Sequence, residues 1–119
     1  MPGIRLLLRA TAIASLIVLC FSTTASAHER RQYIPDGLGY GGIRSDHLTA
    51  YACDTKADGW GVRTRVWFRA TNSYATVGDA NGSSSGCGSR NWGTVPAEFQ
   101  VCTGPSGADY YCTGWWSVF

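Results

Sequence analysis

The clearest pattern of hydrophobic and polar positions runs from residue 60 to residue 69. Its even positions carry residues that suit the interior of a β-sheet: Trp60, Val62, Thr64, Val66 and Phe68. Its odd positions carry a glycine, three arginines and a tryptophan: Gly61, Arg63, Arg65, Trp67 and Arg69. Because successive strand residues point to opposite faces, this alternation predicts one strand with an apolar face and a basic, aromatic face.

Shorter runs of β-branched and aromatic residues predict four more strands, at residues 48–53, 73–77, 94–102 and 108–116. A stretch dense in glycine, serine and asparagine, residues 79–91, predicts a long loop. No part of the mature chain shows the 3.6-residue apolar period of a helix. Strands separated by turn residues predict an antiparallel all-β domain. We expect a small β-sandwich, with a compact β-barrel as the alternative.

The first 27 residues have the three parts of a secretory signal peptide. Arg5 and Arg9 precede an apolar run at residues 10–21, and the small residues Ala25-Ser26-Ala27 precede His28. The apolar run is shorter than the roughly 20 residues that a membrane-spanning helix needs. We therefore expect cleavage before His28 and a secreted, extracellular mature chain without a membrane span.

The mature chain divides into two parts by composition. Residues 28–45 are rich in glycine, arginine and tyrosine without a strand or helix period, which predicts a flexible N-terminal arm. Residues 46–119 hold the predicted strands and form the domain. Eight basic residues balance eight acidic ones in residues 28–119. This neutrality excludes a basic field over the whole surface, so we expect no nucleic-acid partner.

Four cysteines remain after cleavage of the signal segment, and in a small exported chain they predict two disulfides. Three pairings are possible. A turn-forming stretch separates Cys102 from Cys112, so a hairpin there would bring these two together. The remaining pair is Cys53–Cys87, which would join the first strand of the domain to the glycine- and serine-rich loop.

Metal sites are the alternative use of these residues. Zinc could take the cysteines with His28 and His47, but the chain has no Cys-x-x-Cys or His-x-x-x-His spacing. We therefore expect no zinc and no cofactor.

Calcium is an open question at the turn that follows the first strand of the domain. Asp54 and Asp58 could bind it with Asp79 and Asn81 if a disulfide brings the two loops together. A lysine and an arginine stand at two ligand positions of an EF-hand loop, so that motif is excluded. The competing interpretation is a turn in which the aspartates bind local N–H groups and Gly59 supplies a positive φ.

The same turn carries a resemblance. The segment from Cys53 to Val62, Cys-Asp-Thr-Lys-Ala-Asp-Gly-Trp-Gly-Val, is similar to a Cys-Asp-x-x-Ala-Asp-Gly-x-x-Val turn in small secreted proteins of actinobacteria. In those proteins a Gly/Ser-rich cysteine loop follows, and the residues around Cys87 resemble it. The likeness covers residues 51–112. It implies export, disulfides and a β fold, and it names no substrate.

The basic, aromatic face of the 60–69 strand is the main candidate for ligand binding. Same-face neighbours on a strand lie about 7 Å apart, so Arg63, Arg65, Trp67 and Arg69 would form a cationic stripe around one aromatic ring. Such a stripe suits phosphate, carboxylate or an acidic sugar polymer. The competing interpretation is a solvated sheet face whose arginines pair with acidic residues of neighbouring strands.

Trp115 and Trp116 are the second candidate. Consecutive strand residues point to opposite faces, so we expect one of them in the core and the other available to a sugar ring or a protein. Core filling, or covering a disulfide, is the competing interpretation.

These observations predict a secreted, non-catalytic binding protein that contacts an anionic or sugar polymer of the cell exterior, such as the cell wall, or a secreted protein. A small hydrolase that uses His47 and a carboxylate is one alternative. Its neighbour Asp46 would point to the opposite face of a strand, which disfavours a catalytic pair. A secreted inhibitor or toxin-like protein that acts through a protruding loop at residues 79–91 is the other alternative.

Overall fold

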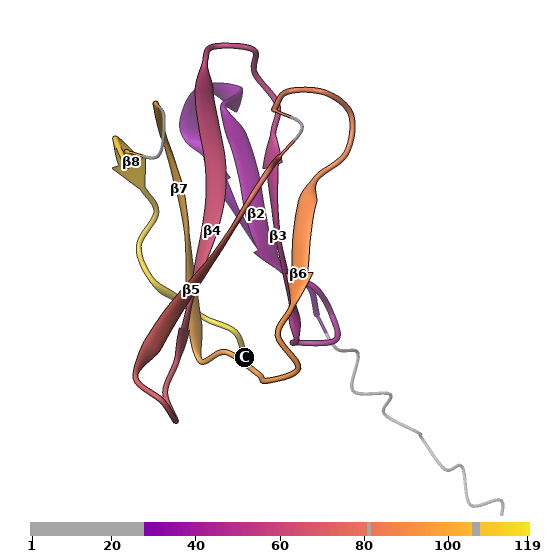
Figure 1. Ribbon diagram of the computed structural model, residues 1–119, viewed down its shortest axis with the longest axis vertical. Helices are drawn as coiled ribbons and strands as arrows, with labels where there is room; N and C mark the ends of the chain where they lie inside the picture. Colours follow the sequence, from indigo (N-terminus) through magenta and orange to yellow (C-terminus); the bar gives the residue numbers. More distant parts are fainter. Residues whose placement is uncertain (1–27, 81, 106–107) are drawn as a thin grey trace, which may run out of the picture.

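The computed structural model describes residues 28–80, 82–105 and 108–119. It is an all-β sandwich of two antiparallel sheets packed face to face (Figure 1). The predicted sandwich is thereby confirmed, and the barrel alternative is wrong. The predicted signal peptide, residues 1–27, lies outside the described residues.

Sheet A has the strand order β1-β2-β3-β6, with β1 Arg30–Ile34, β2 Gly39–Ile43, β3 Thr49–Asp54 and β6 Gly88–Asn91. Sheet B has the order β5-β4-β7-β8, and β9 also pairs with β7. Its strands are β4 Trp60–Phe68, β5 Ser73–Gly78, β7 Glu98–Pro105, β8 Tyr111–Cys112 and β9 Trp116–Ser117. A short 3-10 helix, η1 Pro35–Gly37, joins β1 to β2.

Strand β4 organises sheet B because it pairs with β5 on one side and with β7 on the other. Its even positions from Val62 to Phe68 are buried, as the alternation predicts. They pack with apolar residues of both sheets: Ile34, Ile43, Ala50, Ala52, Val77, Phe99, Val101 and Val118. The basic, aromatic side of β4 therefore faces outward.

Glycine on the inner face of β2 lets the two sheets approach closely. A Cβ atom at Gly41 would overlap the hydroxyl group of Thr64 on β4 and would lie 3.2 Å from Val101 Cγ2. In the space that glycine leaves, Thr64 Oγ1 donates a 2.6 Å hydrogen bond to the carbonyl oxygen of Tyr51. A buried polar side chain thus joins sheet B to sheet A with its hydrogen bond satisfied.

The N-terminal segment belongs to sheet A. Strand β1, from Arg30 to Ile34, pairs with β2 over its whole length, and β2 pairs with β3. The expectation of a flexible arm at residues 28–45 was therefore wrong. The alternation is hidden because two of the three inward positions of β2 are Gly39 and Gly41, where close contact between the sheets replaces apolar side chains, and only the third, Ile43, is apolar.

A layer of tyrosine and arginine covers the outside of sheet A. Tyr51 points away from the core, yet it is only 2% exposed. Arg31 Nε donates a 2.9 Å hydrogen bond to its hydroxyl group, and the Arg31 guanidinium lies 4.6 Å from the ring centre of Tyr40. The guanidinium of Arg44 lies 4.8 Å from the Tyr51 ring centre. Burial, and next a hydrogen bond with Glu29, raises the pKa of Tyr51 to about 12.

The remaining differences from the predicted strands lie at the sheet edges. The 79–91 loop ends in a short strand, β6, whose sequence Gly-Ser-Arg-Asn has no apolar residue. The strand predicted at 94–102 begins later, at Glu98, and continues to Pro105. The strand predicted at 108–116 is present only as two short pieces, β8 and β9.

Both predicted disulfides are present. Cys53–Cys87 joins β3 to the loop that precedes β6, and Cys102–Cys112 joins β7 to β8. Disulfides of this kind are typical of small proteins in oxidising compartments. In the part of the chain that the structure describes, no helix is long and apolar enough to cross a membrane.

Candidate binding site

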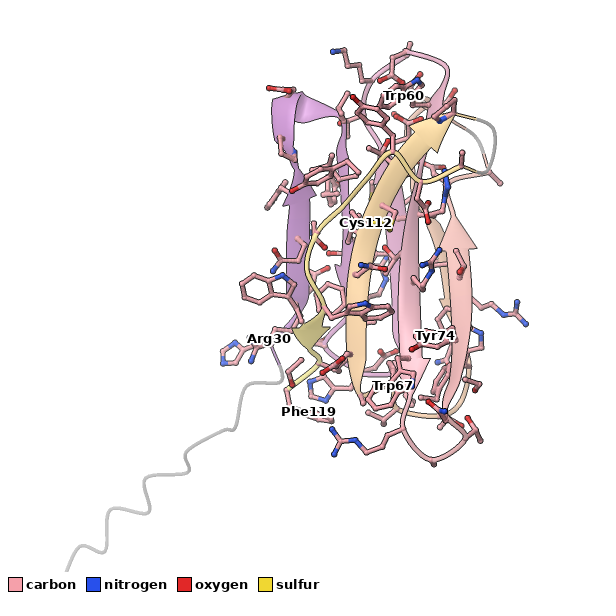
Figure 2. All side chains as sticks on the ribbon, turned by 90° about the vertical axis from the view of Figure 1, so that its left-hand side faces the viewer. Arg30, Trp60, Trp67, Tyr74, Cys112 and Phe119 are labelled. Carbon is pink, nitrogen blue, oxygen red and sulfur yellow. A yellow bond between two sulfur atoms is a disulfide. The ribbon has the colours of Figure 1, made fainter. Side chains whose placement is uncertain are left out.

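The outer face of sheet B is built on β4. Arg63, Arg65 and Trp67 project from alternate positions of this strand, away from the core. Each lies between an outward residue of β5 and one of β7: Gly78 and Cys102 for Arg63, Thr76 and Gln100 for Arg65, and Tyr74 and Glu98 for Trp67. Figure 2 shows Trp67 and Tyr74 side by side on this sheet.

Arg63 is bound by the segment that links β7 to β8. Its Nη1 donates a 2.8 Å hydrogen bond to Asp109 Oδ1. Its Nη2 donates to the carbonyl oxygens of Gly104 and Ala108, at 3.3 and 3.1 Å. The side chain is only 13% exposed. The competing interpretation expected arginines that pair with acidic residues of neighbouring strands. Arg63 does pair with an acidic residue, but Asp109 lies in a connection and not on a neighbouring strand.

Arg65 shares the same carboxylate and is more open. Its Nη2 donates a 2.8 Å hydrogen bond to Asp109 Oδ2, while its Nη1 reaches Gln100 Oε1 only at 3.5 Å. Its side chain is 35% exposed. Because Arg63 and Arg65 share the single carboxylate of Asp109, these three side chains together keep an excess of positive charge. Arg65 presents that charge to solvent.

Trp67 and Arg69 lie at the end of β4. Trp67 Nε1 donates a 3.2 Å hydrogen bond to Asn72 Oδ1 in the turn before β5. Arg69 lies just beyond the strand, exposed, with its guanidinium 5.7 Å from the Trp67 ring centre. The residues of the predicted stripe therefore follow one face, but they differ in what already binds them.

A β-bulge decides which tryptophan joins this face. Strands β8 and β9 pair with β7 in registers that differ by one residue, so two residues of β7 lie opposite three residues of the last segment. The extra residue places Trp115 on the outer face, with its ring centre 5.7 Å from that of Tyr74. Trp116 pairs with the inward-facing Phe99 and lies at the sheet edge, 49% exposed. The two tryptophans thus take opposite sides of the segment, and neither is fully buried.

Hydrogen bonds to Thr113 hold the bulge in place. The Thr113 N–H donates to the carbonyl oxygen of Val101 at 2.8 Å, and the Val101 N–H donates to Thr113 Oγ1 at 3.0 Å. Gln100 Nε2 donates to the Thr113 carbonyl oxygen at 3.1 Å. This last bond fixes the amide of Gln100 so that its Oε1 faces Arg65.

Tyr74 and Trp115 meet across the outer face and divide it into two open hollows. One hollow, of about 420 Å³, is lined by Arg65, Tyr74, Gln100 and Trp115. The other, of about 210 Å³, is lined by Trp67, Tyr74, Glu98 and Trp115. We call the two together the aromatic groove. The groove is open to solvent, and aromatic and polar side chains line it together.

The aspartate turn binds its own backbone. Asp54 and Asp58 each accept a hydrogen bond from the backbone N–H two residues further along, and Gly59 has a φ of 78°. Asp79 Oδ2 accepts from the Asp54 N–H at 2.9 Å. Burial raises the pKa of Asp54. The oxygens of these carboxylates do not converge as a cluster within the described residues, and Asn81 lies outside them.

No cysteine among the described residues offers zinc a free thiolate, because all of these cysteines form disulfides. Cys102 and Cys112 lie near Asp109 in a group with metal-ligand spacing. That carboxylate already binds two arginines, however, and both sulfur atoms are in the disulfide.

His47 lies in the turn between β2 and β3, with its ring centre 4.6 Å from that of Phe119. Its neighbour Asp46 accepts hydrogen bonds from the Leu48 N–H, the Thr49 N–H and the Thr49 hydroxyl group, at 2.8, 2.9 and 2.7 Å. The bond from the Thr49 hydroxyl group lowers the pKa of Asp46. Asp46 therefore stabilises the turn, and nothing in these contacts pairs it with the imidazole.

Four residues of this face do not appear among the sequence candidates: Tyr74, Glu98, Gln100 and Asp109. Alternation along the predicted strand at residues 73–77 puts Tyr74 and Val77 on opposite faces of the sheet. Only the register with β4 sets Tyr74 beside Trp67. Glu98 and Gln100 likewise gain their position from the pairing of β7 with β4. Asp109 lies in the connection between β7 and β8, where no alternation of polar and apolar residues indicates which way a side chain points.

Comparisons of the chain with family models, with curated proteins and with solved structures find no match.

Proposed function

We propose that this chain is an exported, non-catalytic protein that binds a sugar polymer of the cell exterior in the aromatic groove. The observation that carries the proposal is the groove itself, in which aromatic rings stand beside amide, guanidinium and carboxylate groups. Sugars need both kinds of contact, because a pyranose ring has an apolar C–H face and a rim of hydroxyl groups.

The exposure of the rings supports this function. Tyr74 on β5 is 62% exposed, and Trp115 in the bulge before β9 is 39% exposed, although both lie beside a core that could bury apolar surface. Aromatic rings held apart from the core in this way form a platform on which a sugar ring can stack. Their positions are set by β5 and by the bulge, so little conformational entropy is lost on binding.

The number of carboxylates that line the groove favours binding over hydrolysis. Most glycosidases need two carboxylic groups on either side of the scissile bond. Glu98 is the only carboxylate among the lining residues of the groove. Asp109, the nearest other acid on this face, is held by Arg63 and Arg65.

Export is supported by two independent features. The sequence Ala25-Ser26-Ala27 follows an apolar run as in a cleavable signal peptide. The two disulfides fit an oxidising compartment outside the cytoplasm.

The proposal is tested by co-sedimentation of the oxidised chain, residues 28–119, with particles of cellulose, chitin and bacterial cell wall. Trp115→Ala should lower retention about tenfold or more, since a central aromatic residue of a binding site contributes on that scale. Trp116→Ala is the matched control, because it removes a similarly exposed tryptophan from the other side of the same segment. Near-ultraviolet circular dichroism checks that both variants fold.

Retention that falls in Trp115→Ala and persists in Trp116→Ala would support the groove as the site. Equal retention of the two variants would overturn it, and so would a wild-type chain that binds none of the particles.

A further inference from the structure

The aromatic groove has opposite charges in its two hollows. Arg65 lines the larger hollow and Glu98 lines the smaller one. Arg65 and Trp67 are same-face neighbours on β4, so the two hollows are about one strand repeat, roughly 7 Å, apart. A bound polymer therefore meets a cationic group and an anionic group at adjacent positions.

The cationic side is available because Arg63 and Arg65 are bound unequally. Arg63 makes contacts with Asp109 and with two carbonyl oxygens, and it is nearly buried. Arg65 makes one short contact, to Asp109, and one long contact, to Gln100, and it lines the larger hollow. Those two contacts use two of its five N–H donors. A guanidinium group with free donors beside aromatic rings suits a sugar that carries a carboxylate.

The anionic side excludes the same sugar. A second carboxylate next to Glu98 would be repelled, because two like charges side by side disfavour each other. Hydroxyl or amide N–H groups of a neutral sugar would instead donate hydrogen bonds to Glu98. Trp67 and Trp115 give this smaller hollow its aromatic walls.

Building on the proposed function, we infer that the groove selects a polymer in which acidic and neutral sugar residues alternate. The carboxylate of the acidic residue accepts hydrogen bonds from Arg65, and the neutral residue lies between Trp67 and Glu98. A polymer with a carboxylate on every residue fits only the larger hollow, beside Arg65. A polymer with no carboxylate fits only the smaller hollow, beside Glu98.

Calorimetric titration with three probes tests this inference: an oligosaccharide of alternating glucuronate and N-acetylglucosamine, a galacturonate oligomer, and a β-1,4-glucan oligomer. The alternating probe should bind roughly tenfold or more tightly than either of the others, as expected for one charge-assisted contact. Arg65→Gln should reduce the alternating probe to the affinity of the neutral one. Glu98→Gln should improve binding of the galacturonate oligomer.

Arg69→Gln is the matched control, because it removes an exposed arginine that lies outside both hollows. Its effect should be small and should disappear at high salt. Equal affinity for the alternating and neutral probes, with dependence on Trp115, would overturn this inference and leave the proposed function standing. Equal losses of affinity for the alternating probe in Arg65→Gln and Arg69→Gln would also overturn this inference. Failure of all three probes to bind would count against both proposals.

Discussion

The two disulfides lie on different sheets, and this separates their effects on stability from their effects on binding. Cys53–Cys87 spans 34 residues on sheet A, and Cys102–Cys112 spans 10 residues on sheet B. In the chain-entropy description of cross-links, these loops contribute about 3.8 and about 2.7 kcal/mol to the free energy of unfolding. The longer loop should therefore matter more for stability.

Binding should follow the opposite order. Cys112 lies three residues before Trp115, in the segment that carries the aromatic wall of the groove, whereas Cys53 and Cys87 lie on the other sheet. We expect Cys53→Ala/Cys87→Ala to lower the melting temperature by about 15–30 °C and to leave polymer binding intact at low temperature. Cys102→Ala/Cys112→Ala should lower it by about 10–20 °C and weaken binding.

Thermal unfolding followed by circular dichroism gives the first quantity, and co-sedimentation at a temperature where both variants are folded gives the second. The reasoning would be refuted by wild-type retention in the variant that lacks Cys102–Cys112. It would also be refuted if the two variants lost binding in proportion to their loss of stability, because the disulfides would then act through global unfolding alone.

Two other properties can be measured without a ligand. Gly41→Ala should lower the free energy of unfolding by about 1–3 kcal/mol, because its Cβ has no room between the sheets. Gly61→Ala has open space around it and should be neutral or raise the free energy of unfolding by up to about 1 kcal/mol. Urea unfolding that showed equal stabilities for the two variants would contradict the close approach of the sheets. Absorbance titration should show one tyrosine that keeps its proton to about pH 12, and Tyr51→Phe should remove that late phase. Because the ordinary pKa of tyrosine is about 10, the unfolded chain releases this proton first, so stability should fall as pH rises from about 10 towards 12; ionisation of every tyrosine near pH 10 would show that Tyr51 is not buried.

The sequence predicted those parts of the fold in which side-chain alternation is strong. The alternation along β4 predicted both its buried and its outward face, and the turn before it was predicted from Asp58 and Gly59. Strands with few apolar residues were missed. In β2 two of the three inward positions are glycines, and β6 reads Gly-Ser-Arg-Asn, so neither shows the period-2 pattern on which strand prediction depends.

The candidate site was predicted in part, because its residues come from separate strands. The stripe on β4 was visible in the sequence, but the fate of its arginines depends on Asp109, which is 46 positions from Arg63. Trp115 and Trp116 were expected on opposite faces. Which of them would meet Tyr74 depends on the bulge, and a bulge changes register without changing the residue types on either side of it.

The bulge before β9 has a consequence for how this surface can change in evolution. Loss of the single codon between Thr113 and Trp115 would remove the extra residue and join the two registers along β7, with Trp116 still opposite Phe99 and Ser117 still opposite Glu98. Loss of a residue from a strand without a bulge would instead turn every later side chain to the other face of the sheet. The bulge therefore gives this edge of sheet B a residue that can be lost while the later pairs keep their partners.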